Sequence, residues 1–291
     1  MAHAENKAAD DLLDREFKVL DHGFIRLVDY MGSDQAISQA ARVSYGEGTK
    51  KVSEDRSLIR YLMRRRHTSP FEMVEFKFHV KLPIFVARQW IRHRSASVNE
   101  YSGRYSIMRE EFYRPEPKEI RFQSDVNRQG RSERETPDDM KARFLSHLEA
   151  SQRGQYEEYH RFVEEGLARE LARINLPLSL YTEWYWKIDL HNLFHFLRLR
   201  LDRHAQKEIR AYADVMADMV KIVCPIAYEA FEDYILNART FSASEMTILG
   251  EYLREIKIDM DSLVTRGLSK REAGEFLAKV KQIKDVTPDD D

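Results

Sequence analysis

The sequence predicts an α+β fold in which helices dominate. Two segments, 74–82 and 179–188, alternate apolar and polar residues with the period of two that is typical of a half-buried strand. Several longer segments repeat apolar residues every three or four positions, which is the spacing of an amphipathic helix. Strands mixed with a larger number of helical segments indicate an α+β domain.

The N-terminal part of the chain begins with a polar segment and then changes from strands to helices. Residues 1–16 are polar and acidic, and we expect them to be disordered. Residues 17–31 contain short apolar runs split by an Asp-His-Gly turn, which indicates a pair of strands. Helices are expected over 33–45 and 53–66, where apolar residues follow polar starts at helical spacing.

The clearest strand comes next. In 74–82 the apolar residues alternate with Glu, Lys and His, so one face is buried and the other is polar, and Pro83 ends the run. Residues 84–93 read as a helix that leads into an unusually polar segment.

The second half of the chain contains longer helices. Residues 124–138 hold a single apolar residue and are expected to form an excursion or a disordered loop. A long helix should follow from Pro137 to about Phe162, and the strand 179–188 should precede two helices, the second broken near Pro225.

The C-terminal part reads as a helical extension. Two Ser-x-x-Glu capping boxes, at Ser242 and Ser269, each precede an amphipathic run. We therefore expect a main domain over 17–239, with the polar insert at 124–138, and a helical C-terminal extension over 240–291.

Composition excludes several classes of protein. The 291 residues include 47 Lys and Arg against 49 Asp and Glu, so no global polycation is present to bind nucleic acid. One cysteine cannot form an intramolecular disulfide framework. No apolar run is long enough to span a membrane, and the N-terminus lacks the apolar core of a signal peptide. We expect a cytoplasmic protein with no nucleic-acid or membrane partner.

The densest group of polar residues lies in 89–106. Arg92, His93, Arg94 and Arg104 occur there with Glu100, and few core-forming residues separate them. Arginine forks bind phosphates with two parallel hydrogen bonds, and a carboxylate among them can orient an arginine or bind a sugar hydroxyl. From composition alone, a solvated charged loop or a local nucleic-acid site is also consistent with this segment.

Other candidate groups give weaker signals. His191 and His195 share a helix face and could bind zinc, as in a metal-dependent hydrolase, but no third ligand is evident and ordinary core or surface histidines are favoured. Cys224 lies in an apolar stretch and is expected to be a buried, inert thiol. Neither a GxGxxG motif nor a Walker A loop is present, which argues against a Rossmann or P-loop site.

At these residues the chain resembles a known family. Arg92-His93-Arg94 followed after seven residues by Ser102 is similar to the signature of flavin-dependent thymidylate synthase. The segments AARVSY, ARINLPLSLYTEWYW and LRLRLDRHAQKEI also resemble that family, in the family's order, over roughly 17–235.

The resemblance implies a fold and a reaction. The fold would be a mixed β-sheet flanked by helices. The enzyme would methylate dUMP to dTMP with 5,10-methylenetetrahydrofolate as the carbon donor and FAD, reduced by NADPH, as the hydride source, and it would release tetrahydrofolate. It would be a cytoplasmic homotetramer with active sites shared between subunits, and it would use no cysteine nucleophile, no metal, no nucleic acid and no membrane.

The resemblance also implies two sets of ligand-binding residues. The flavin side would include Ser44, Ser69, Arg92, His93, Arg94, Glu100, Asp189, His191, His195 and His204. The dUMP side would include Gln89, Arg92, Glu100, Ser102, Gly103, Arg104, Arg173 and Arg200. Arg200 would also be catalytic, because it would face the uracil base and promote ionisation at N3. Asp189 departs from the asparagine of some family members, and an ionised carboxylate cannot donate a hydrogen bond to the flavin.

Overall fold

The computed structural model describes residues 6–43, 52–126 and 128–285. The chain divides into two compact units, Met1–Leu236 and Asn237–Asp291, and the boundary lies close to the one expected at 239/240. Each unit is described separately below. Within the described residues, no helix has the length and apolar character needed to cross a membrane.

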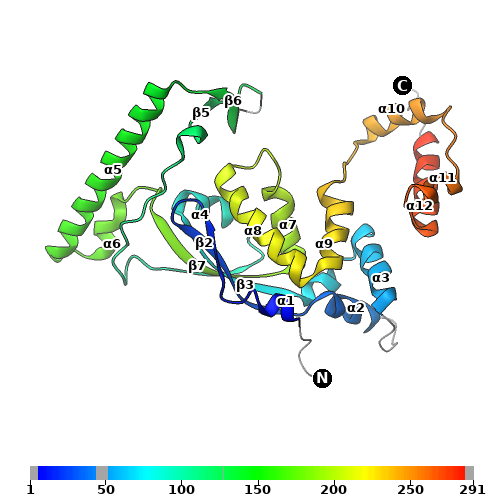
Figure 1. Cartoon of the computed structure of the whole chain (residues 1–291), viewed down its shortest axis with the longest axis horizontal. Helices are drawn as coiled ribbons and strands as arrows, with labels where there is room; N and C mark the ends of the chain where they lie inside the picture. The colour runs from blue at the N-terminus through cyan, green and yellow to red at the C-terminus, as the bar shows by residue number, and fades with distance from the viewer. Residues whose placement is uncertain (1–5, 44–51, 127, 286–291) are drawn as a thin grey trace. The chain divides into compact units, whose positions relative to one another are not determined.

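The first unit is built on a five-stranded sheet in the order β1-β2-β3-β7-β4 (Figure 1). The strands are β1 (Glu16–Val19), β2 (Gly23–Met31), β3 (Glu75–Pro83), β4 (Ser97–Glu100) and β7 (Tyr181–Asp189). Every strand pair is antiparallel, which is more regular than the mixed sheet that was expected. The predicted strand pair and both alternating strands are confirmed.

Helices α4, α7 and α8 of the first unit pack against this sheet. The helices described in this unit are α1 (Lys7–Asp10), α2 (Asp34–Val43), α3 (Val52–Arg64), α4 (Ile84–Trp90), α5 (Asp138–Glu164), α6 (Arg169–Ala172), α7 (Leu190–Arg200), α8 (Lys207–Val223) and α9 (Pro225–Phe231). Shorter helical turns occur at η1 (Ser69–Met73), η2 (Pro117–Glu119), η3 (Arg173–Asn175) and a π-helical η4 (Glu232–Leu236). The α+β class predicted from the sequence is therefore confirmed.

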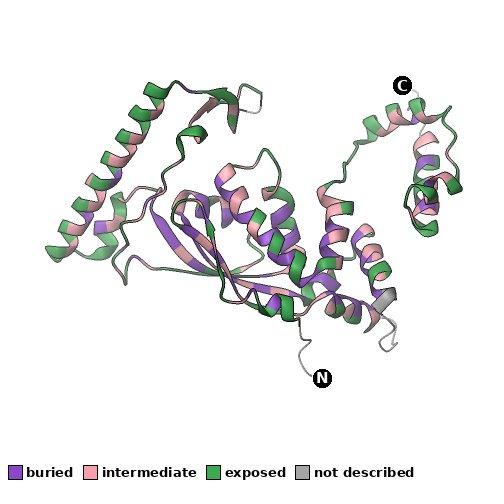
Figure 2. Ribbon diagram, in the orientation of Figure 1, coloured by how far each residue is buried: buried purple, intermediate pink, exposed green. Residues whose placement is uncertain are grey.

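Trp90 is the centre of the aromatic core between the sheet and the helices. Its ring centroid lies 5.7 Å from that of Trp184 and 5.3 Å from that of Trp186, both on β7. On the helix side, Phe196 of α7 lies at 4.8 Å and Tyr212 of α8 at 5.8 Å. Figure 2 shows the buried surfaces of the sheet and of these helices facing one another. Burial of large aromatic groups of this kind contributes most of the stabilisation of such a core.

The polar insert was expected to be an excursion or a disordered loop, and the structure contradicts the disorder. It forms a two-stranded antiparallel hairpin of β5 (Arg121–Gln123) and β6 (Arg131–Glu135). Two long-range contacts explain the order: Arg131 pairs with the buried Glu208 of α8, and the Thr136 hydroxyl donates to the Ile120 carbonyl at 2.6 Å. Neither contact is visible in the local sequence pattern.

The N-terminal segment also departs from its expected disorder. Within residues 6–16, Asn6 caps α1 and its amide donates to the Val223 carbonyl of α8 at 3.4 Å. Ala9 and Leu12 are buried in the core. The segment is ordered because these two apolar side chains leave water.

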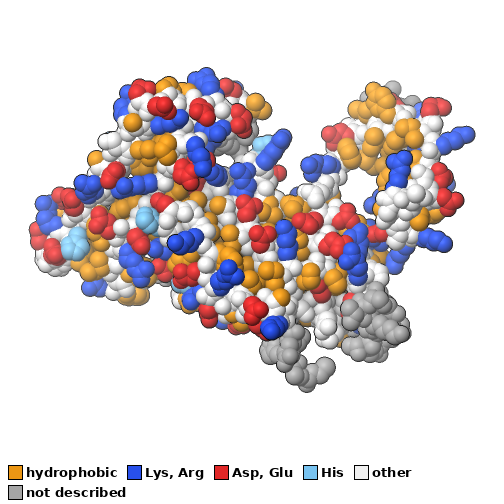
Figure 3. Space-filling view, in the orientation of Figure 1, with side chains coloured by type: hydrophobic (Ala, Val, Ile, Leu, Met, Phe, Trp, Pro, Cys, Tyr) orange, Lys and Arg blue, Asp and Glu red, His pale blue; other side chains and the backbone are white. Residues whose placement is uncertain are grey.

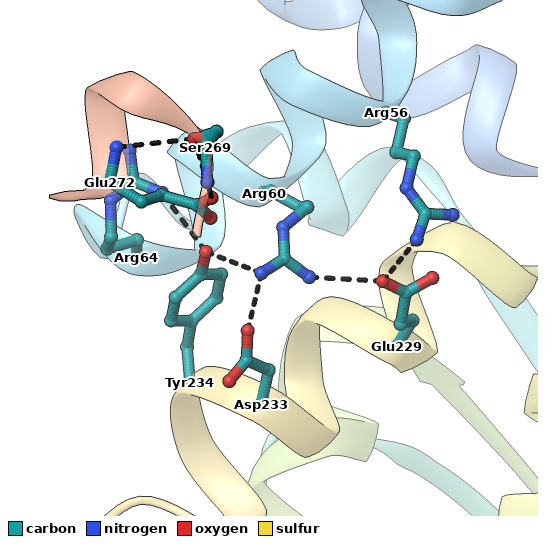
Figure 4. Close-up of polar contacts among 8 residues, drawn as sticks. All are labelled: Arg56, Arg60, Arg64, Glu229, Asp233, Tyr234, Ser269 and Glu272. Atoms are coloured by element: carbon teal, nitrogen blue, oxygen red, sulfur yellow. Dashed lines mark hydrogen bonds and ion pairs between the residues drawn. The ribbon is translucent and has the colours of Figure 1, made fainter. Parts of the chain in front are cut away.

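A polar cluster attaches α3 to the end of the first unit (Figure 4). Arg60 donates to Glu229 of α9 at 3.1 Å, to Asp233 at 2.5 Å and to the Tyr234 hydroxyl at 2.8 Å. Arg56 adds a second ion pair to Glu229 at 2.5 Å. A shared network of this type contributes more to stability than isolated surface ion pairs do, because each group holds its neighbours in place.

The second unit contains three helices, α10 (Ala243–Leu253), α11 (Met260–Thr265) and α12 (Lys270–Lys284). Both predicted capping boxes are present, at Ser242 and Ser269. A Cβ atom on Gly250 would lie 2.3 Å from the Ile283 carbonyl oxygen, so only glycine allows α10 and α12 to approach this closely.

The break predicted at Pro225 is confirmed, and a buried carboxylate stabilises it. The helix α8 ends at Val223, and α9 starts with Pro225 at its first position. Asp34 of α2 accepts hydrogen bonds from the Ile226 and Ala227 backbone amides, both at 2.9 Å. Burial raises the pKa of Asp34, while these two amides favour its charged form.

We expect Asp34→Ala to lower the free energy of unfolding by about 2–4 kcal/mol, because one buried and one partly buried amide would lose their acceptor. Asp34→Asn keeps one carbonyl oxygen and should lose less. Urea denaturation followed by circular dichroism measures both. An Asp34→Ala protein as stable as the parent would show that the cap contributes nothing.

Candidate active site

The signature triplet follows the end of α4 and lines a cavity. Arg92, His93 and Arg94 come directly after this helix, whose buried Trp90 fixes its last turn against the sheet. Together with the end of α7 they form the arginine cavity, of about 330 Å³. Its lining residues are Arg92, His93, Arg94, Ser95, Ile188, Asn192, His195, Leu199 and Arg200.

His93 and Arg200 are joined directly inside this cavity. The Arg200 Nε donates a hydrogen bond to the His93 Nε2 at 3.1 Å, so that nitrogen is an acceptor and carries no proton. Burial, then the nearby charges of Arg200 and His195, lower the pKa of His93 to about 4. His93 is therefore neutral at physiological pH, and it fixes the plane of the Arg200 guanidinium while leaving its terminal NH₂ groups available to a ligand.

Arg92 and Arg94 are exposed on the rim of the arginine cavity. Across the residues that the structure describes, no ion pair joins either of them to a carboxylate. Two guanidinium groups on the rim of one cavity without counter-charges favour binding of an anion.

A second cavity adjoins the first through His195, which lines both. We call it the histidine cavity; it has a volume of about 150 Å³ and mostly apolar walls from η1, α3 and α7. Its lining residues are Leu62, Met63, Arg66, His67, Thr68, Phe71, His191, Phe194, His195, Arg198 and Ile235. Imidazole and guanidinium groups at the rim of an apolar slot suit a flat heteroaromatic ligand that carries phosphates.

Asp189, which was expected to contact the cofactor, has a structural role at the start of α7. It is the N-cap of α7: its carboxylate accepts from the Asn192 backbone amide at 2.9 Å and from the Asn192 side-chain amide at 2.7 Å. Asn192 in turn lines the arginine cavity. Asp189 thus holds Asn192 in place at the wall of the arginine cavity. The sequence interpretation did not include Asn192.

A third cavity, the serine cavity, contains much of the predicted dUMP set. It has a volume of about 500 Å³, and Glu100, Ser102, Gly103 and Arg173 all line it. The Thr182 hydroxyl donates to Glu100 at 2.8 Å, which holds this carboxylate against β7. A Cβ on Gly103 would lie 2.8 Å from the Met108 sulfur and 3.2 Å from Arg173 Cδ, so glycine lets the arginine pack closely here.

Other predicted site residues lie outside these three cavities. Arg104 forms an exposed ion pair with Glu170 at 3.2 Å, beside the serine cavity. Gln89 donates to Gln206, and His204 is exposed and pairs with Asp202 at 2.8 Å. Ser69, at the start of η1, follows the lining residue Thr68. Ser44 lies outside the described residues.

The sequence interpretation also missed residues that line the histidine cavity. Arg66, His67 and Thr68 come from the turn between α3 and η1, and Arg198 lies on α7 one turn after His195. Their position beside Ser69 and His195 in sequence was the signal that could have identified them.

Cys224 is completely buried, and burial raises the pKa of its thiol well above the ordinary value. A neutral thiol in the core cannot attack a substrate in any of these cavities. Across the described ranges, no three His, Cys, Asp or Glu side chains gather where they could hold a metal ion.

Comparison with known proteins identifies the family. The family model described as "Thymidylate synthase complementing protein" matches residues 26–226. A flavin-dependent thymidylate synthase from Treponema denticola is 57% identical over 274 residues, which cover 94% of this chain and 100% of the relative. The chain belongs to the flavin-dependent thymidylate synthase family.

Two further relatives agree with this assignment. The synthase of Wolbachia pipientis wMel is 55% identical over 94% of both chains. The crystal structure of the UMP/dUMP methylase PolB from Streptomyces cacaoi, bound with 5-Br dUMP, superposes with a TM-score of 0.68 at 33% identity. It covers 76% of this chain and 99% of its own. The predicted family, the enzyme class that methylates dUMP to dTMP, and the flavin cofactor are therefore confirmed.

The described residues of this synthase fit a flavin dinucleotide. Arg92 and Arg94 lack counter-charges, as a pyrophosphate requires, and the adjoining histidine cavity offers apolar walls to a ring. His93, being neutral with its Nε2 occupied by Arg200, has its Nδ1–H available as a donor. The donor set thus matches an anionic, partly aromatic ligand.

The pKa of His93 leads to a pH prediction. Between pH 6.5, the ordinary pKa of histidine, and about pH 4, His93 binds a proton in the unfolded chain but not in the folded one. The contribution of His93 to the free energy of unfolding therefore falls as the pH drops through this range. In histidine-labelled protein, the His93 ring resonances should stay those of neutral imidazole down to about pH 5. Arg200→Gln should raise the pKa of His93, although burial will keep it below 6.5. A His93 that titrates near 6.5 in the parent enzyme would contradict the buried Arg200–His93 arrangement.

Proposed function

We propose that this synthase holds FAD across the arginine and histidine cavities and dUMP in the serine cavity, and that Arg200 activates the uracil. The observation that carries the proposal is the pair of adjoining cavities, joined at His195, with the uncompensated cations of Arg92 and Arg94 on their rim. NADPH and 5,10-methylenetetrahydrofolate are the proposed co-substrates. When bound, the NADPH-reduced flavin supplies the hydride that completes the new methyl group.

The flavin-binding role is assigned to residues from three segments. Arg92 and Arg94 provide positive charge for the pyrophosphate, and His93 and His195 provide ring nitrogens within the cavities. His191 lines the histidine cavity, next to η1 where Ser69 lies. The neutral state of His93 matters here, because a protonated imidazole would lose the hydrogen bond that orients Arg200.

The dUMP-binding role is assigned to the turn that follows β4. A monophosphate dianion needs several donors, and the Ser102 hydroxyl, the Gly103 amide and the Arg173 guanidinium meet at the serine cavity. Arg104 becomes available when its exposed pair with Glu170 opens, which is a small cost for a surface ion pair. Glu100, already held by Thr182, suits a sugar hydroxyl.

Arg200 is the proposed catalytic residue. Neutral uracil is a weak carbon nucleophile, and the only cysteine is buried in the core, so C5 must gain electron density without a thiolate adduct. Burial lowers the pKa of Arg200, but a guanidinium still remains cationic at any workable pH. A cation fixed beside the ring stabilises the anion at N3 or the enolate-like state.

The site is proposed to be completed by a second copy of the chain. Within one chain, Arg200 lines the arginine cavity, whereas Ser102, Gly103 and Arg173 line the serine cavity. Both groups are assigned to dUMP, and the side chains of Arg200, Ser102 and Arg173 are partly exposed. A homotetramer in which neighbouring subunits each contribute one set would bring them together.

We expect Arg200→Ala to lower the rate of dTMP formation roughly 10²–10³-fold at saturating dUMP, equivalent to about 3–4 kcal/mol of transition-state stabilisation. The variant should still bind FAD, seen by its visible absorbance, and still be reduced by NADPH. Arg200→Lys should recover only part of the rate, because an ammonium cannot replace the planar fork. Near-normal dTMP formation by Arg200→Ala would leave this arginine only a structural role at the end of α7.

Subunit mixing tests the shared site. Arg104→Ala and Arg200→Ala should each be inactive alone, but a randomly mixed tetramer should regain activity in about a quarter of its sites if the two arginines come from different subunits. Mixing is done by denaturing and refolding the two variants together, with each variant refolded alone as the control. Absence of any recovery in a mixture shown by mass spectrometry to contain hybrids would place both residues in one subunit.

A further inference from the structure

The hairpin that replaced the expected loop forms one wall of the largest cavity described, of about 790 Å³. We call it the hairpin cavity. Its other walls come from η2, the α7–α8 loop and the first turn of α8, so segments far apart in sequence enclose it. The ion pair between Arg131 and the buried Glu208 attaches the hairpin to α8.

Positive charge dominates the lining of the hairpin cavity. Its five cations are Arg121, Arg131, Arg203, Lys207 and Arg210, and its two carboxylates are Glu119 and Glu133. Figure 3 shows Lys and Arg side chains gathered beneath the hairpin, over the helices below it. Cations therefore outnumber carboxylates among the side chains that line the cavity.

The carboxylates do not neutralise all of these cations. Glu133 pairs with Arg121 at 3.1 Å, and Glu119 pairs with Arg131 at 3.3 Å and also contacts Lys207. Within the described residues, Arg203 and Arg210 form no ion pair; the Arg210 guanidinium donates instead to the Arg203 carbonyl at 3.0 Å. The N-terminus of α8 also lies here without a side-chain cap, which adds partial positive charge.

The hairpin cavity adjoins the proposed active site. His204 is among its lining residues, and Gln206, another lining residue, accepts a hydrogen bond from Gln89 of α4. Gln89 lies one turn before the signature arginine Arg92. A ligand whose reacting ring occupies the active site can therefore extend its tail into this cavity.

The arrangement of the cations indicates the chemistry of that tail. They come from the hairpin, from the α7–α8 loop and from α8, whereas a phosphate cradle is built from successive backbone amides of one segment. Separated guanidinium groups suit several carboxylates spaced along a flexible chain, each of which can take one bidentate contact. Among the co-substrates of the proposed reaction, the folate carries such carboxylates on its glutamate tail.

We propose that the hairpin cavity binds the γ-linked polyglutamate tail of methylenetetrahydrofolate, with Arg203 and Arg210 as its principal ligands. This inference rests on the proposed function, which brings the folate to the neighbouring site. Long-tailed folates are then the preferred carbon donors of this synthase.

Direct binding tests the cavity independently of turnover. Fluorescein-labelled penta-γ-glutamate should bind the full-length protein, by fluorescence anisotropy, with an affinity that falls steeply as salt is raised. The double variant Arg203→Gln/Arg210→Gln should lose this binding by about tenfold or more. Arg143→Gln, which changes an exposed arginine of α5 outside the cavity, is the matched control and should bind as the parent does. Circular dichroism of each variant establishes that it is folded.

Kinetics give the second measurement. For the parent enzyme, the KM for pentaglutamyl methylenetetrahydrofolate should be about tenfold or more below the KM for the monoglutamyl form. In the double variant, the two KM values should differ by no more than about threefold. Equal KM values for the two folates in the parent enzyme would overturn the proposal. So would displacement of the labelled peptide by 2′-phospho-ADP-ribose but not by unlabelled pentaglutamate, and this second result would assign the cavity to NADPH. Failure of the parent to form dTMP from the monoglutamyl donor would instead refute the proposed function, while the anisotropy would still decide the cavity.

Discussion

The packing of Trp90 against Phe196 is the contact on which the candidate site depends. The strand β3 continues into α4, and β7 continues into α7, but the two strands are antiparallel, with Pro83 opposite Tyr181 and Glu75 opposite Asp189. The two helices therefore start from opposite ends of the sheet and cross the same face toward each other. They meet where Trp90, the last residue of α4, packs against Phe196 in the middle of α7, with ring centroids 4.8 Å apart. His93 and Arg200 are brought within hydrogen-bond distance by this meeting, because each follows its aromatic residue by about one turn.

That geometry also explains why the Arg200–His93 pair can hold a definite orientation. The His93 ring packs at 4.9 Å from Phe196, so burial disfavours its protonation before the charge of Arg200 does so further. A neutral ring accepts a hydrogen bond from Arg200, and the guanidinium is thereby fixed without a carboxylate partner. An arginine paired with a carboxylate would have much of its charge compensated. Here the positive charge remains available to a ligand, which is the requirement for stabilising a developing anion.

Local sequence patterns were sufficient for the elements and the signature, but not for long-range polar contacts. The alternation of 74–82 and the helical spacing of most helices reflect burial on one face, which a single segment records by itself. The order of the β5–β6 hairpin depends on Arg131 reaching Glu208, and the role of Asp189 depends on capping Asn192; neither partner is marked by periodicity. The family resemblance implied the dUMP-binding residues as one set, because it describes a complete binding site and does not say which residues of a single chain lie close together. The separation of Arg200 from Ser102 into different cavities became visible only in the fold.

The candidate site lies on helix ends and on a surface turn, so several of its arginines are exposed to bulk water. Arg92, Arg94 and Arg104 are all exposed in the single chain, and electrostatic stabilisation by a guanidinium is weak where bulk water screens it. Chemistry that relies on a fixed cation, with no covalent adduct to the enzyme, needs those groups to be covered during the reaction. The buried Cys224 offers no alternative route, because its thiol lies in the core at the junction of α8 and α9. The same exposure that leaves the arginines open to phosphates therefore favours an active site whose cations are covered by the bound ligands during the reaction.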